Sequence, residues 1–238
     1  MLSFFDIKII LLQLTIPNLK MTEAIERIFI SKDWITIVLM IIFTLLILNR
    51  IKFSERFYKL QYILLNNSYI NSYSKASPLV FNVFNILFFA VATLTISFIL
   101  FITLNLYYPD HISYDFIFFL KTLFFVVTFT VLRIILGFLL GSLFEREKEQ
   151  RYFSFLKISY LANFSLMTIP LITINLYTES TLYTHFLLVY SLVLFLYYYV
   201  LILKNNQSFI FRNSFYIILY ICTLEIAPFL IIFKALIV

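Results

Sequence analysis

Long apolar runs separated by short polar segments are the main pattern along this chain. An α-helix needs roughly 20 such residues to cross the hydrocarbon core of a bilayer. The first run is the shortest, and it is long enough to span if Asp33 and Arg50 lie at opposite interfaces with Trp34 as an aromatic anchor. We therefore predict an all-α membrane bundle of six transmembrane helices. The predicted spans are residues 34–48, 79–106, 116–144, 158–177, 185–203 and 215–233.

The segment before the first span contains only a short apolar run, residues 9–16, which is too short to cross a membrane. Asp6 and Lys8 interrupt it and no small-residue cleavage site follows, so a signal peptide is not expected. Either this segment lies at the membrane interface or translation starts at Met21. We divide the chain into an N-terminal extension, 1–33, which includes a candidate interfacial helix, and a transmembrane domain, 34–238.

Composition and charge placement agree with a membrane protein. The chain is 63% hydrophobic and only 13% charged, against about 25% charged in soluble domains. The net charge of +6 does not indicate nucleic acid, because Lys and Arg gather in the first, third and fifth connections and are missing from the second and fourth. Short cytoplasmic loops hold such an excess. This predicts that both termini lie outside the cytoplasm, although the basic residues of the N-terminal extension argue against it.

The first connection has apolar residues at helical spacing with basic residues between them. One interpretation is a basic amphipathic helix that lies on the inner leaflet. The other is an extension of the first span that packs against its neighbours. The apolar positions are Phe53, Phe57, Leu60 and Leu64, and the expected inner-leaflet contacts are Arg50, Lys52, Arg56 and Lys59.

The third span carries the chain's only two glycines, Gly137 and Gly141, on the same helical face as Arg133. Glycines four residues apart let two helix backbones approach closely. A charged group at mid-membrane costs about 2.5–3.5 kcal/mol on insertion scales, so a partner is expected. Glu225 lies near the middle of the sixth span, at a depth that matches Arg133. We predict an intramembrane Arg133–Glu225 ion pair beside a close helix contact.

This pair has a structural and a functional interpretation. In the first it fixes which helices touch; in the second Glu225 changes protonation during proton or ion transfer. Pro170 and Pro228 are expected to bend their helices. Each also frees one backbone carbonyl, which can bind a cation or accept a bond from a neighbouring hydroxyl.

Sequence signatures of enzymes are missing. The two histidines, His111 and His185, fall at the predicted outer face without H-E-x-x-H spacing. A phosphate-binding loop, a G-x-S-x-G nucleophile elbow and a dinucleotide fingerprint are also missing, since two glycines can hardly provide them. We therefore expect no metal, no cofactor and no enzymatic activity.

Two short motifs resemble a known family. Lys32-Asp33-Trp34-Ile35-Thr36 opens the first span, and Tyr220-Ile221-Cys222-Thr223-Leu224-Glu225-Ile226-Ala227-Pro228 lies in the last. Together they are similar to an uncharacterised family of Bacteroidota inner-membrane proteins catalogued as domain of unknown function 4271. The resemblance covers roughly residues 21–238. It implies a bacterial inner membrane and brings no activity, cofactor or catalytic residue.

The sequence favours a non-enzymatic integral membrane protein that acts as a structural or accessory subunit of an inner-membrane complex. A small proton- or ion-coupled transporter that uses Glu225 and Arg133 is the alternative. The expected partners are the lipid bilayer and either another membrane protein or a second copy of the chain, without nucleic acid.

Overall fold

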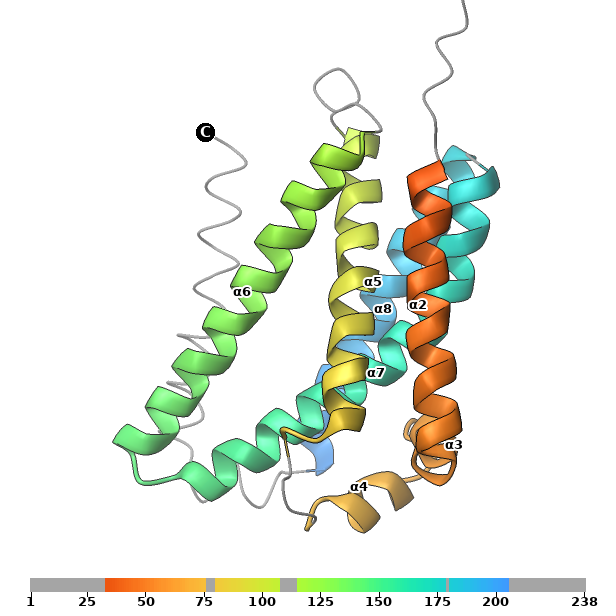
Figure 1. Cartoon of the computed structure of the whole chain (residues 1–238). Helices are drawn as coiled ribbons and strands as arrows, with labels where there is room; N and C mark the ends of the chain where they lie inside the picture. Colours follow the sequence, from red (N-terminus) through yellow and green to blue (C-terminus); the bar gives the residue numbers. More distant parts are fainter. Residues whose placement is uncertain (1–32, 76–79, 108–114, 179, 206–238) are drawn as a thin grey trace, which may run out of the picture. The chain divides into compact units, whose positions relative to one another are not determined.

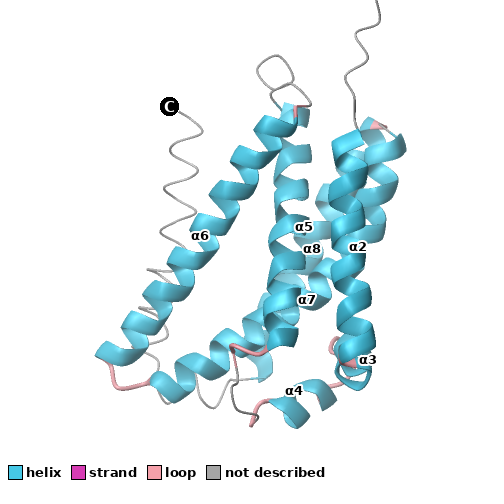
Figure 2. Cartoon of the chain, in the orientation of Figure 1, coloured by secondary structure: helices cyan, strands magenta, loops and turns pink. Residues whose placement is uncertain are grey.

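The computed structural model describes residues 33–75, 80–107, 115–178 and 180–205, all within one unit, Lys32–Val238. Every regular element in these residues is a helix, as Figure 2 shows. The helices, labelled in Figure 1, are α2 (Asp33–Lys52), α3 (Ser54–Gln61), α4 (Ser68–Tyr73), α5 (Val83–Tyr107), α6 (Phe116–Leu143), α7 (Glu147–Thr178) and α8 (Thr181–Asn205).

Five of these helices, namely α2, α5, α6, α7 and α8, are long and apolar enough to cross a membrane. Their positions match the first five predicted spans. The sixth predicted span, 215–233, lies outside the described residues. The all-helical class and the apolar character of the long helices are therefore confirmed.

Consecutive long helices run in opposite directions, so the helix ends that carry Lys and Arg gather at one end of the described bundle (Figure 1). Arg50 and Lys52 lie in the last turn of α2, and Lys204 lies in the last turn of α8. The turn between α6 and α7 reaches the same end. Cations at helix C-termini also offset the negative end of the helix dipole.

Polar side chains satisfy the first backbone N–H groups of two helices. The Asn82 side-chain oxygen accepts a hydrogen bond from the Phe84 N–H at 3.3 Å, where α5 begins. The Asn66 side chain accepts one from the Ser68 N–H at 3.0 Å, where α4 begins. Asn82 directly precedes α5, a position at which asparagine is favoured because its short side chain reaches the unpaired donors.

The turn between α6 and α7 is tight and contains a left-handed residue. Glu145 has φ 54°. Its N–H bonds to the Ser142 carbonyl at 3.2 Å, and the Arg146 N–H bonds to the Gly141 carbonyl at 2.7 Å. These two bonds form a Schellman motif, which closes a helix C-terminus and usually places glycine at the left-handed position.

Helices α5 and α7 form the centre of the described bundle. α5 packs against α2, α6, α7 and α8, and α7 packs against α3, α5, α6 and α8. In their most apolar windows, 50% of α5 and 61% of α7 is buried, against 11% of α6 and 22% of α8. α6 and α8 therefore present most of their surface outward, as lipid-facing helices do.

The structure favours the second interpretation of the first connection. α3 follows α2 almost without interruption, since the Phe53 N–H still bonds to the Asn49 carbonyl at 3.0 Å. Its apolar residues Phe57 and Leu60 are buried in a cluster with residues of α4, α5, α7 and α8. The apolar face of α3 thus packs against protein instead of lying on a leaflet.

Helix α7 begins well before the predicted span. The sequence predicts a span over 158–177, whereas α7 starts at Glu147 and includes the charged segment 147–151. Arg151 and Glu147 pair across one turn at 3.1 Å. Further along, Phe155 and Leu156 are almost fully buried, so this half of α7 belongs to the core of the protein.

Candidate functional site

A buried hydrogen-bond network lies where α7 and α8 meet the end of α3. Asn163 of α7 is fully buried, and its side-chain N–H₂ donates to the carbonyls of Leu60 at 2.9 Å and Gln61 at 3.3 Å. The Tyr198 hydroxyl of α8 donates to the Asn163 side-chain oxygen at 2.7 Å. One amide therefore forms hydrogen bonds with two carbonyls at the C-terminus of α3 and with one hydroxyl. These bonds replace those that the buried groups would otherwise make with water.

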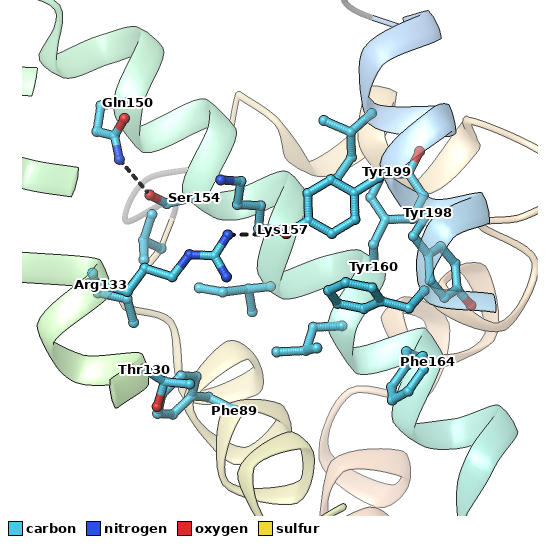
Figure 3. A pocket seen from close by; sticks show the side chains of 16 residues that line it. Phe89, Thr130, Arg133, Gln150, Ser154, Lys157, Tyr160, Phe164, Tyr198 and Tyr199 are labelled. Atoms are coloured by element: carbon cyan, nitrogen blue, oxygen red, sulfur yellow. Dashed lines mark hydrogen bonds between the residues drawn. The ribbon is translucent and has the colours of Figure 1, made fainter. Parts of the chain in front are cut away.

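Next to this network is a cavity of about 130 Å³ between α5, α6, α7 and α8, drawn in Figure 3. Its walls are mostly apolar and aromatic, including Phe89, Phe164 and Phe195. Two cations line it, Arg133 from α6 and Lys157 from α7. The cavity is therefore an apolar space with a positively charged wall.

Arg133 points into this cavity. Its guanidinium donates to the hydroxyl of Tyr199 on α8 at 3.2 Å. Figure 3 shows the guanidinium and the amino group of Lys157 approaching the same part of the space, with the Gln150 and Ser154 side chains above them. Sequence reasoning found Arg133 but counted Lys157 only as a loop charge. Because α7 starts at Glu147, Lys157 instead lies ten residues inside this helix.

Gly141 lies where α6 comes close to α7. A Cβ added there would lie 2.9 Å from the Cβ and 3.1 Å from the Cγ of Gln150 on α7. Such distances are too short for ordinary carbon contacts, so Gly141 permits the close approach of α6 to α7. Gly137 is buried in α6.

Arg56 is not placed for the inner-leaflet contact that we expected. Only 7% of its surface is exposed, and its guanidinium carbon lies 4.6 Å from the ring centre of Phe84 and 4.8 Å from that of Tyr73. It donates to the Asn85 side-chain oxygen at 3.2 Å and to the Tyr69 hydroxyl at 3.3 Å. Stacking on aromatic rings and two hydrogen bonds suit a planar guanidinium, so Arg56 joins α3, α4 and α5.

Burial also changes the chemistry of Tyr69, which lies on α4 beside Arg56. Loss of water around its hydroxyl raises the pKa of Tyr69, and the Arg56 charge acts in the opposite direction. The phenol therefore stays neutral at physiological pH and serves as a hydrogen-bond acceptor for Arg56. The cluster around Arg56 thus holds α3, α4 and α5 together.

The other predicted leaflet residues are more accessible. Arg50 and Lys52 are exposed. Lys59 pairs with Glu55 at 2.7 Å on the outer side of α3, and this partner lowers the pKa of the Glu55 carboxyl. An exposed pair of this kind contributes little to stability.

Two predicted site residues, Glu225 and Pro228, lie outside the described residues, so the Arg133–Glu225 pair stays a prediction. Pro170 lies inside α7, which continues through it to Thr178. Among the described residues, no group of three or more His, Cys, Asp or Glu side chains could hold a metal ion.

Comparison with known proteins agrees with the family resemblance of the two motifs. The model of a family described as Domain of unknown function (DUF4271) matches residues 35–236. No match was found among the curated proteins or among the solved structures. The matched region includes all five long apolar helices except the first two residues of α2. The chain therefore belongs to the family described as Domain of unknown function (DUF4271).

Proposed function

We propose that this protein is a non-enzymatic, multi-pass protein of a bacterial inner membrane that acts as a structural or accessory subunit of a membrane complex. The observation that carries the proposal is the use of its polar interior. Asn163 and Tyr198 satisfy each other and the end of α3, and Arg56 is held by Asn85, Tyr69 and aromatic rings. These groups hold helices together, as a structural role requires.

The outward faces of α6 and α8 support the proposal that the protein binds another membrane protein. Leu139 on α6 is 53% exposed and Leu196 on α8 is 56% exposed, and each lies among other exposed apolar residues. Such faces suit the bilayer, and they equally suit a transmembrane helix of another protein or of a second copy.

The test is purification of the native protein from membranes in a mild detergent, followed by identification of what remains bound. A membrane complex that co-purifies in fixed proportion supports the accessory role, and a monodisperse monomer contradicts it. Leu139→Trp and Leu196→Trp form a matched pair of variants for this experiment. Loss of the partner with only one of them identifies the helix that binds it.

A proton- or ion-coupled transporter is the second candidate, because Arg133 and Lys157 line a cavity inside the bundle. In this reading Glu225 would be the titrating group and Arg133 its counter-ion. Glu225→Gln separates the two functions. Normal expression with lost ion flux in proteoliposomes would support transport, whereas loss of folding or assembly would support the structural role.

A further inference from the structure

The cavity between α5, α6, α7 and α8 has the chemistry of a site for one carboxylate on an apolar body. Its described walls contribute the positive charges of Arg133 and Lys157 and otherwise mostly apolar and aromatic surface. Two cations that line one largely apolar cavity favour the binding of an anionic group there. A hydrophobic segment with a single acidic residue would fit both features.

The chain contains one such segment. Residues 215–233 are almost entirely apolar, and Glu225 is their only charged residue. It is also the only acidic residue after Asn205, where α8 ends. Ile202 lines the cavity three residues before that end, so the chain leaves the described bundle next to the cavity. The nine residues 206–214 are enough for a turn between antiparallel helices.

The positions of the three charges along their helices also agree. Arg133 lies ten residues from the end of α6, and Lys157 lies ten residues from the start of α7. Glu225 lies ten residues from the start of the predicted sixth helix. Each charge is thus ten residues, or about 15 Å at 1.5 Å per residue, from one end of its own helix.

We propose that this cavity receives residues 215–233 and that the Glu225 carboxylate binds both Arg133 and Lys157. The sequence alone suggested one cation for Glu225; the structure adds Lys157 as a second. The site then fastens the sixth helix between α6, α7 and α8. This inference does not depend on the accessory role.

Cross-linking tests the location without altering the three charges. In a Cys222→Ser background, Leu161→Cys lies one turn from Lys157, and Phe229→Cys lies one turn from Glu225 on the same predicted face. A short bifunctional thiol reagent should join this pair in membranes. The matched control is Leu161→Cys with Ala227→Cys, because position 227 is about 200° around a helix from 225. Equal cross-linking of both pairs, or of neither in well-expressed protein, would overturn the proposal.

A double-mutant cycle tests the two-cation claim. Lys157→Gln and Arg133→Gln are each combined with Glu225→Gln, and folded yield is measured by size-exclusion chromatography in detergent. We expect each cation substitution to lower the yield in the parent protein and to have a much smaller effect in the Glu225→Gln background. An equal effect of Lys157→Gln in both backgrounds would remove Lys157 from the site. If Arg133→Gln and Lys157→Gln instead release a co-purified anionic phospholipid, seen by native mass spectrometry, a lipid phosphate occupies the cavity and the proposal fails.

Discussion

Asn163 shows how a single side chain can determine the packing of three helices. Its amide group donates to two carbonyls of α3 and accepts from the hydroxyl of Tyr198 on α8. In surroundings without water, each of these groups would otherwise be costly to bury. The polar side chain therefore specifies which parts of α3, α7 and α8 face one another.

Replacement of Asn163 by Leu should destabilise the protein strongly. It removes the amide that donates to the Leu60 and Gln61 carbonyls and leaves the Tyr198 hydroxyl without its acceptor, and we expect a loss of about 2–3 kcal/mol in the free energy of unfolding. Tyr198→Phe removes only one bond and should cost about 1 kcal/mol. Thermal unfolding in detergent measures both. In the double variant the Tyr198→Phe cost should largely disappear, and full additivity would show that the two side chains do not interact.

Glu145 offers a stabilising change. Its left-handed backbone costs a residue with a Cβ about 1–2 kcal/mol, and glycine carries no such cost. Glu145→Gly should therefore raise the midpoint of thermal unfolding, with a gain of about 1 kcal/mol. Lys148→Gly, three residues on and inside α7, is the control and should lower the midpoint because glycine disfavours a helix. The same direction of change in both variants would contradict this account.

At the level of elements, the contact between α6 and α7 depends on Gly141. Gly141→Ala gains about 1 kcal/mol in helix propensity, but its Cβ would meet the Cβ of Gln150 at 2.9 Å. The clash involves the base of a side chain on a packed helix, so we expect a net loss of about 1–3 kcal/mol. Ser142→Ala on the exposed side should change stability little. A stabilised Gly141→Ala protein, measured by thermal unfolding, would refute the close approach.

The long helices could be predicted from hydropathy, because an apolar run of sufficient length has few alternatives to a helix in a membrane. Hydropathy places spans and not helix ends, so it missed the first turns of α7. Glu147, Lys148 and Glu149 lower the local hydropathy but do not prevent a helix. For α3, periodicity found the apolar face, and only tertiary structure shows that protein covers it.

The interior contacts could not be predicted in the same way. Arg56 reads as a surface charge in sequence, since nothing local shows that Phe84 and Tyr73 will enclose it. Lys157 reads as a loop residue for the same reason. Arg133 was found because a charge inside an apolar run is unusual wherever its partner lies. The Asn163 bonds join residues 103 positions apart, beyond any local pattern.

For the whole molecule, the gathering of Lys and Arg at one end of the bundle predicts its orientation in the membrane. We expect the α6–α7 turn in the cytoplasm and the α7–α8 connection outside. In a Cys222→Ser background, Thr181→Cys should react with a membrane-impermeant thiol reagent in intact cells. Lys148→Cys should react only after the membrane is made permeable. The reverse pattern would show that the orientation is inverted.

The hydrogen bonds from Asn163 to α3 also bear on how the protein is made. α3 is synthesised about a hundred residues before Asn163, and Tyr198 follows later still. Until then, the Leu60 and Gln61 carbonyls lack the amide donor that they have in the finished protein, so we expect this part of the fold to be completed only after α7 and α8 are made. A stop codon before α8 should therefore yield a fragment that membrane proteases degrade, and separate expression of the missing part should rescue it.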